Sequence, residues 1–468
     1  MTEGLRPVDG SYREEGSRVF AGGGRICRAL DSRGSRDLES LALTKFFAEA
    51  LAAGKVVQTW VPPDADALLA ALPGQWSAVV EHEPVPVVSY PYEWSFPMLR
   101  AAAMLQLELL HVALGEGFIC EDATPYNVQW SGVRPVFVDV SSLRPHAQGD
   151  PWQGYRQFCQ LYLYPLMLEA YRGVAFQPLL RGCLEGLAPE DMSRLFGWGD
   201  ILRRGVMTHV LLHATLSRAY GGRGGDVRGQ LERGGFSVEA IRNNVRGLHA
   251  IVRNLSSARM DSEWSGYAEC ESYGEGGLEA KTAFVEKWTA SREWGTVWDV
   301  GANRGLFSRI AARHARHVLA LDADAAVSGA LFDALAKEDV GNVTPLVYRF
   351  NDPSPGLGWR GRERSPLVER ARPSLVMLLA VVHHLCITAN IPVGELMACL
   401  RELGGGVIVE FVEREDEKVQ LLMRNKRKEH ADYCREVFER ELSARFRVLA
   451  RQELPGSPRI LYFAEPLS

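Results

Sequence analysis

Several patterns that would assign a function directly are missing from this 468-residue chain. Its eight cysteines form no Cys-x-x-Cys pair, so the sequence predicts neither a zinc site nor a disulfide framework and favours reduced thiols. The formal net charge of −5 disfavours nucleic acid as the main substrate, because nucleic-acid binders usually carry a basic face. The apolar runs fall short of the about 20 residues that cross a bilayer, and no signal-peptide pattern opens the chain. We therefore expect a cytoplasmic protein that has no membrane partner.

The length and composition predict two domains. One hydrophobic core rarely serves 468 residues, and 46% hydrophobic with 24% charged residues is ordinary for globular proteins. The pattern predicts a disordered polar tail over 1–16 and an α+β N-terminal domain over 17–235. A helical connector over 236–290 then leads into an α/β domain over 291–468. Three aromatic side chains of the connector are candidates for a lid over a ligand, although packing is their more frequent role: Trp264, Tyr267 and Tyr273.

The most informative segment is 297–308, which reads Val-Trp-Asp-Val-Gly-Ala-Asn-Arg-Gly-Leu-Phe-Ser. The apolar run that ends at Val300 predicts a buried parallel strand, and helical spacing from Leu306 onward predicts a helix. Between them, Gly301 and Gly305 allow the backbone to approach a ligand closely while free N–H groups at the helix start point towards it. Their spacing differs from the Gly-x-Gly-x-x-Gly of dinucleotide enzymes.

An acid precedes this loop, and the resulting pattern Asp-x-Gly-Ala-Asn-x-Gly resembles motif I of class I S-adenosylmethionine (SAM) methyltransferases. The resemblance implies SAM as the cofactor and a Rossmann-like, seven-stranded α/β sheet as the fold of the second domain. It also implies that the cofactor contacts the residues of this loop: Asp299, Gly301, Ala302, Asn303 and Gly305.

Polar residues end the next two predicted strands. The strand over 317–321 is followed by Asp322 and Ala323, and one carboxylate there can accept hydrogen bonds from two vicinal ribose hydroxyls. Asp324 is the alternative ribose ligand. The third strand is predicted over 342–352, and the resemblance places its last residues on the adenine amino group: Asp352, with Asn351 beside it.

A continuous apolar run over 374–382 predicts a fourth strand in a sheet that is covered on both faces. The resemblance places Ala380, near its end, at the cofactor. The remaining predicted elements are a fifth strand (406–412), a helix (430–444) and a hairpin (446–454 with 459–464). Their order is the one that the seven-stranded sheet requires.

Methyl transfer to oxygen or carbon usually needs a base within hydrogen-bond reach of the acceptor. The candidates beyond the fourth and fifth strands are His384, His383, Glu410 and Glu413. Histidine is favoured because its unperturbed pKa lies near 6.5. We predict His384 as the first candidate, followed by His383 and Glu410. The alternative is that both histidines are structural.

Three polar residues of the first domain have a spacing that resembles protein-kinase-like and aminoglycoside-phosphotransferase-like enzymes: Asp122, Asn127 and Asp139. The resemblance implies that Asp122 accepts a hydroxyl proton while Asn127 and Asp139 bind magnesium and ATP. The usual His-Arg or His-Gly pair is missing before Asp122, and Arg28 replaces the expected lysine. The domain is therefore predicted as a degenerate kinase-like fold. The alternative is that Asp122 and Asn127 cap a loop.

Four stretches of the first domain (89–94, 125–129, 135–139 and 155–159) resemble a branch of two-part methyltransferases, some of them nodulation-protein-like. The resemblance covers nearly the whole chain. This second resemblance does not fix a substrate, because related folds serve different chemistries. From the sequence as a whole we predict a SAM-dependent methyltransferase that acts on a small-molecule acceptor, either a natural product or a sugar derivative, at oxygen. The alternatives are a bifunctional protein with an ATP-binding N-terminal domain and a non-catalytic SAM-binding scaffold. The oligomeric state stays open, with a homodimer as one option.

Overall fold

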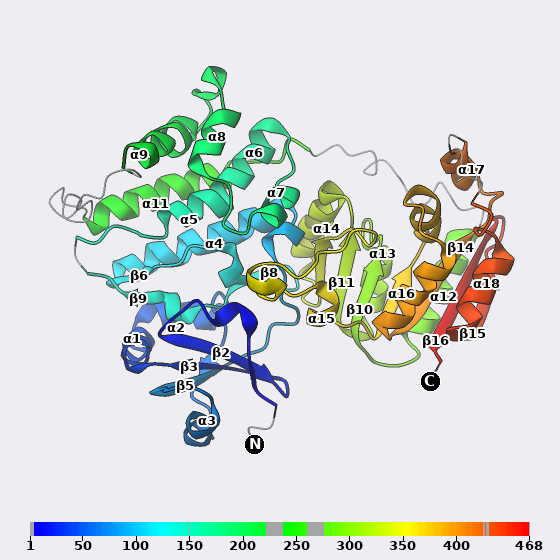
Figure 1. Cartoon of the computed structure of the whole chain (residues 1–468), viewed down its shortest axis with the longest axis horizontal. Coiled ribbons are helices and arrows are strands. Elements are labelled where there is room, and N and C mark those ends of the chain that lie inside the picture. Colours follow the sequence, from blue (N-terminus) through cyan, green and yellow to red (C-terminus); the bar gives the residue numbers. More distant parts are fainter. Residues whose placement is uncertain are drawn as a thin grey trace.

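The computed structural model describes residues 4–147, 149–220, 237–259, 276–424, 426 and 430–467. Figure 1 shows an N-terminal half, coloured blue to green, beside a C-terminal half, coloured yellow-green to red. The three aromatic side chains that are predicted to form a cofactor lid lie outside the described residues: Trp264, Tyr267 and Tyr273.

The C-terminal half is built on the predicted seven-stranded sheet, which is confirmed. Its spatial order is β12 (Val343–Val347), β11 (Ala315–Asp322), β10 (Trp294–Val300), β13 (Leu375–Leu378), β14 (Gly406–Val412), β16 (Arg459–Pro466) and β15 (Phe446–Glu453). The first five of these strands are parallel, and β16 runs antiparallel to both of its neighbours. From β10 the chain first adds β11 and β12 on one side of the sheet, and it then adds β13 and β14 on the other side of β10. The carboxyl ends of β10 and its neighbours therefore form a crevice where such sheets bind ligands.

Helices lie on the faces of this sheet and around its ends (Figure 1). They are α12 (Gly277–Thr289), α13 (Leu306–Ala312), α14 (Ala325–Glu338), α15 (Leu367–Arg370), α16 (Val393–Leu403), α17 (Glu417–Met423) and α18 (Arg435–Ser443). In Figure 1, α17 lies beyond the upper end of the strands. All residues of β13 and β14 are buried. Burial on both sides explains why their sequences are continuous apolar runs rather than alternating ones.

The N-terminal half begins with an antiparallel sheet of five strands. Their order is β1 (Arg6–Pro7), β2 (Ser17–Gly22), β3 (Arg25–Leu30), β5 (Ala78–His82) and β4 (Thr59–Trp60). Three helices accompany this sheet: α1 (Ser32–Ala42), α2 (Lys45–Ala52) and α3 (Ala65–Ala71). Between β2 and β3, Gly23 and Gly24 have positive φ angles of 59° and 79°. Two central residues of that kind make a tight hairpin turn, so the glycines are explained by the turn alone.

A helical lobe follows, together with two short hairpins. The hairpins pair β6 (Phe118–Cys120) with β9 (Leu143–Pro145) and β7 (Val128–Ser131) with β8 (Arg134–Phe137). The helices include α4 (Phe96–Gly115), α5 (Tyr155–Phe158), α6 (Tyr164–Arg172), α7 (Gln177–Gly182), α8 (Pro189–Leu195), α9 (His213–Tyr220) and α11 (Val238–Arg253). Among the helices that the structure describes, α4 alone is long and apolar enough to cross a bilayer, and 61% of its apolar window is buried inside the protein. It is the central helix of this lobe.

Residues 4–16 differ from the predicted disordered tail. Arg6 and Pro7 pair with β2, and Arg13 forms an ion pair with Glu363 of the C-terminal half at 2.6 Å. Glu14 lies 3.3 Å from Arg144. These charged side chains have partners far away in the sequence, and a local polar pattern does not reveal such partners.

The N-terminal half covers the β12 edge of the C-terminal sheet. The Thr344 hydroxyl of β12 donates to the carbonyl of Gly132 at 2.9 Å. Next to this edge, Arg370 forms an ion pair with Glu93, and their side chains are only 6% and 0% exposed. A covered edge strand and a buried charge pair fix the two halves to each other.

Candidate functional site

The glycine loop after β10 is shaped by close packing. Gly301 and Gly305 both have a φ of +75°, and a Cβ on Gly301 would lie 2.5 Å from a methyl group of Val381. Any larger residue would therefore be strained and would push the loop out of place. Behind the loop, the Ser308 hydroxyl of α13 donates to the carboxylate of Asp299 at 2.5 Å. The buried Asp299 thus joins the end of β10 to the following helix and supports the loop from below.

Asp322 at the end of β11 holds the other side of this loop. Its two carboxylate oxygens accept the backbone N–H groups of Asn303 and Asp324, each at 2.9 Å. Burial raises the pKa of Asp322, while these backbone bonds act in the opposite direction. Each carboxylate oxygen has two lone pairs, so it can still accept a hydroxyl. The structure therefore brings the predicted residues Asn303 and Asp322 together, and the carboxylate of Asp322 suits the two hydroxyls of a vicinal diol.

The alternative ribose ligand, Asp324, has a structural role. Its carboxylate accepts the N–H groups of Ala326 and Val327 at 2.8 and 3.3 Å, and it thereby caps the start of α14. Asp322 therefore binds the glycine loop, whereas Asp324 caps a helix. Ala323, which lies between them, is exposed.

The predicted adenine ligands lie beyond a strand that is shorter than expected. β12 ends at Val347, and Asn351 and Asp352 belong to the loop that follows. The carboxylate of Asp352 forms an ion pair at 3.0 Å with Arg181 of the N-terminal half. Arg181 lowers the pKa of Asp352, so this side chain is ionised at neutral pH. The adenine role stays a prediction, and the contact with Arg181 adds a feature that the sequence pattern did not contain.

The segment after β13 brings Ala380 and the two histidines towards the glycine loop. Ala380 has a positive φ of 59°, which is uncommon outside glycine and asparagine and concentrates at functional sites. Its neighbour Val381 packs against Gly301. The rings of His383 and His384 follow, with centroids 4.3 Å apart, at the start of the π-helix His384–Thr388.

Burial separates the two histidines. His383 is 2% exposed, and no described residue is a hydrogen-bond partner of its Nδ1 atom. His384 is half-buried and is therefore the one that a ligand can reach. Burial lowers the pKa of both, with a further contribution from the other histidine for His383 and from Lys418 for His384. Both rings are therefore neutral at pH 7, the state that a base requires.

Glu410 differs from its predicted role as a base. Its side chain is 0% exposed and lies 2.8 Å from Lys281 and 3.3 Å from Arg459. Burial alone would raise the pKa of Glu410, but the two cations hold it below its usual value. A carboxylate that is stabilised in its ionised form is a poor proton acceptor. The fourth candidate, Glu413, has Arg435 within 3.5 Å.

Sequence reasoning missed the charged cluster around Glu410. Arg459 of β16 also pairs with Asp416 at 2.9 Å, and Lys281 of α12 lies over the ring of Phe307 at 4.7 Å. The cluster connects α12, β14, β16 and the start of α17 beside the histidines. Lys281 is 129 positions from Glu410, and Arg459 is 49 positions from it, so no local spacing signals these contacts.

The polar residues of the N-terminal half come together only in part. Asn127 donates to Asp139 at 3.3 Å, but the other oxygen of Asp139 pairs with Arg28 at 2.9 Å. Asp122 instead accepts a bond from Gln157 at 3.2 Å. An arginine thus lies against the carboxylate that is predicted to hold magnesium. Across the described residues, no three or more His, Cys, Asp or Glu side chains are grouped to hold a metal ion.

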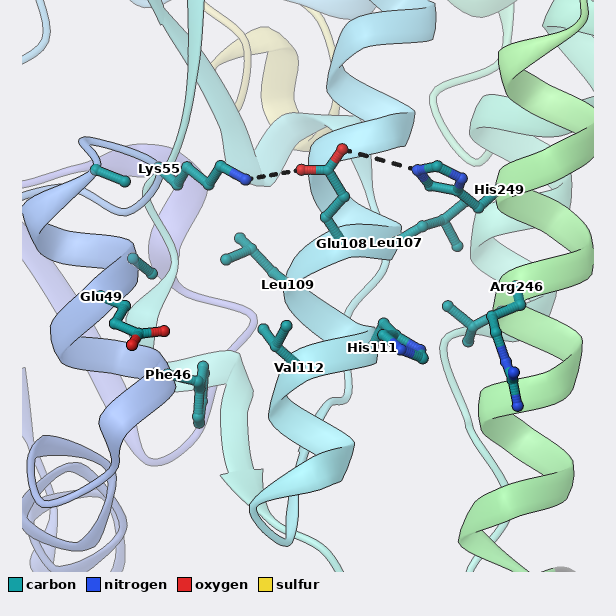
Figure 2. A pocket seen from close by; sticks show the side chains of 13 residues that line it. Phe46, Glu49, Lys55, Leu107, Glu108, Leu109, His111, Val112, Arg246 and His249 are labelled. Carbon is teal, nitrogen blue, oxygen red and sulfur yellow. Dashed lines mark hydrogen bonds and ion pairs between the residues drawn. The ribbon is translucent and has the colours of Figure 1, made fainter.

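A separate pocket of about 510 Å³ lies in the N-terminal half, where residues of α2, α4 and α11 line it (Figure 2). At its upper end in the view, Glu108 lies between Lys55 at 2.8 Å and His249 at 3.7 Å. The other walls are mainly apolar and include Phe46 and Val112. No sequence motif pointed to this pocket, and it contains none of the predicted site residues.

Comparison with known proteins places this site in context. No family model matches the chain. It is 32% identical over 461 residues to the nodulation protein NoeA of Rhizobium meliloti (strain 1021), across 98% of this chain and 96% of that protein. Among solved structures, the N-methyltransferase NodS from Bradyrhizobium japonicum WM9 aligns with 41% of this chain and 97% of its own, at 12% identity and a TM-score of 0.30. The bifunctional kinase-methyltransferase WbdD aligns with 40% of this chain and 39% of its own, at 16% identity and a TM-score of 0.28.

Proposed function

This chain belongs to the family of the nodulation protein NoeA, and we propose that it is a SAM-dependent methyltransferase. The proposed acceptor is a small molecule, a natural product or a sugar derivative, that is methylated at oxygen. The observation that carries the proposal is the carboxylate of Asp322, which is held by backbone N–H groups beside the Gly301–Gly305 loop at the carboxyl edge of the sheet. The residues that would hold the cofactor are the loop, Asp322 and Ala380.

The methyl group of bound SAM is already activated, so the protein mainly has to align the acceptor and exclude water. His384 takes the acceptor proton, because its ring is neutral at pH 7 and is partly accessible. The buried ring of His383 packs against it, with the two ring centroids 4.3 Å apart. Glu410 stays ionised between Lys281 and Arg459 and therefore takes no proton from the acceptor.

Calorimetric titration of the whole chain with SAM tests this proposal. We expect saturable binding at one site, and we expect Asp322→Ala to weaken it about a hundredfold, because two hydrogen bonds to a charged group are lost. Asp333→Ala is the matched control, since Asp333 is an exposed acid of the helix that follows Asp322. Absence of binding by the unmodified chain, or equal binding by Asp322→Ala, would contradict the proposal.

The bifunctional alternative needs Asp139 to bind magnesium. The contact between Arg28 and Asp139 at 2.9 Å speaks against it, because the guanidinium already neutralises the carboxylate. Thermal protection by magnesium and ATP that is lost in Asp139→Ala would favour this alternative. The scaffold alternative would instead be favoured by SAM binding without turnover of any acceptor.

A further inference from the structure

One arginine of the N-terminal half holds the loop that follows β12. The guanidinium of Arg181, at the end of α7, donates to both carboxylate oxygens of Asp352 at 3.0 Å. It also reaches the carbonyl oxygens of Asp352 and Pro353 at 3.4 and 3.3 Å. Paired N–H groups on one carboxylate give a geometrically specific contact, unlike a single surface ion pair.

We propose that Arg181 is a positioning residue for the cofactor site, which makes the N-terminal domain a structural part of that site. This inference rests on the proposed function. Arg181 fixes the path of the loop 348–353, and the loop carries Asn351 and Asp352 to the adenine end of the cofactor. SAM binding therefore depends on contact between the two domains.

The loop is fixed at its start and needs a second support further along. Immediately after β12, the N–H of Tyr348 donates to the carbonyl of Asp322 at 2.7 Å, so the loop begins beside the ribose ligand. Further on, the Asp352 side chain is 60% exposed. Of the cations in the described ranges, Arg181 alone lies within ion-pair distance of it. Without Arg181, Asp352 would lose the one ion pair that it forms with the described part of the chain.

The domain that carries Arg181 is itself held firmly against the sheet. In α7, the Gln177 amide donates to the carbonyl of Trp94 at 2.9 Å, and Leu180 is buried. Glu93, which directly precedes Trp94, pairs through its carboxylate with Arg370 of the C-terminal half. Arg181 therefore projects from a fixed body, and a preorganised contact lowers the entropy that ligand binding would otherwise lose.

Asp352 can serve both Arg181 and a ligand. Each oxygen of an ionised carboxylate accepts two hydrogen bonds, and Arg181 uses one on each. A second lone pair on each oxygen stays available for an amino group. Because Arg181 also lowers the pKa of Asp352, the carboxylate stays ionised, and in this form it accepts hydrogen bonds and donates none.

The test is calorimetric titration of the full chain with SAM in three variants. Arg181→Ala should raise the dissociation constant about tenfold, while the thermal midpoint stays within a few degrees of the original. The dissociation constant of Arg181→Lys should lie between those of the unmodified chain and Arg181→Ala, because lysine keeps the charge but not the paired geometry. Arg194→Ala is the matched control, since Arg194 belongs to the same domain and pairs with Asp191 in an exposed position.

Hydrogen exchange of the backbone amides at 349–352 gives a second readout that needs no ligand. Exchange should be faster in Arg181→Ala than in Arg194→Ala, because the loop has lost its support. Unchanged exchange, or SAM affinity equal to that of the control, would overturn the inference. If the unmodified chain bound no SAM, the proposed function would fail instead, so the two failures are distinguishable.

Discussion

At the scale of single residues, the site depends on the protonation state of His384. Burial and Lys418 lower its pKa below 6.5, so the ring is neutral over the physiological range and becomes protonated only as the pH falls. A base must be unprotonated, so kcat should be flat near pH 7 and decrease on the acidic side. Replacing His384 by Ala should lower kcat by about a hundredfold or more and leave SAM affinity unchanged, because the ring acts on the acceptor.

Steady-state kinetics with an identified acceptor, paired with a SAM titration, checks this prediction. His383→Ala is the comparison, because the His383 side chain is buried whereas that of His384 is partly accessible. It should lower kcat less than His384→Ala does. If both variants kept full kcat, the histidines would be structural, and methyl transfer would need no side-chain base from this segment.

At the scale of elements, the sequence predicted those parts that local pattern encodes. Apolar runs bounded by turns located β10, β11, β13 and β14, because a strand buried on both faces has to be apolar throughout. The predicted third strand was too long at its end. β12 stops at Val347, and Asp352 lies in the following loop, where it pairs with Arg181 of the other domain. Contacts between distant segments, such as Glu410 with Lys281, leave no periodic signal and were missed.

The contact between the two halves provides a prediction at the same scale. Arg370 and Glu93 are almost fully buried, so Glu93→Gln leaves the Arg370 charge without its partner. We expect a loss of about 3–5 kcal/mol in the free energy of unfolding. Arg134 and Asp339 form an ion pair across the same interface but are 66% and 76% exposed. Removal of that exposed pair through Arg134→Ala should cost only about 0–1 kcal/mol.

Urea unfolding of the two variants measures the difference directly. Equal losses would mean that the buried pair contributes no more than the exposed one. In that case, packing along the β12 edge rather than charge pairing would hold the halves together, and the Thr344 bond to Gly132 would become the contact to test.

At the scale of the whole molecule, buried histidines make stability depend on pH. His317 on β11 is 4% exposed, and neither ring nitrogen has a hydrogen-bond partner among the described residues. Burial lowers its pKa to about 4. Because the folded pKa lies below the unfolded value near 6.5, the unfolded chain binds a proton between these two pH values that the folded chain does not bind. Acidification through this window therefore destabilises the fold.

Replacing His317 by Leu removes this group from both states, whereas every other titrating group stays in place. The variant should be more stable than the original chain at pH 7.5, because two unpaired polar atoms are no longer buried. Its advantage should grow by about 1.4 kcal/mol at pH 5.5, since one pH unit below the unfolded pKa is worth that much per proton. Urea unfolding of both proteins at the two pH values gives the four free energies required. An advantage of the same size at both values would mean that His317 is protonated equally in the folded and unfolded chains, and hence that water or a neighbouring group reaches its ring.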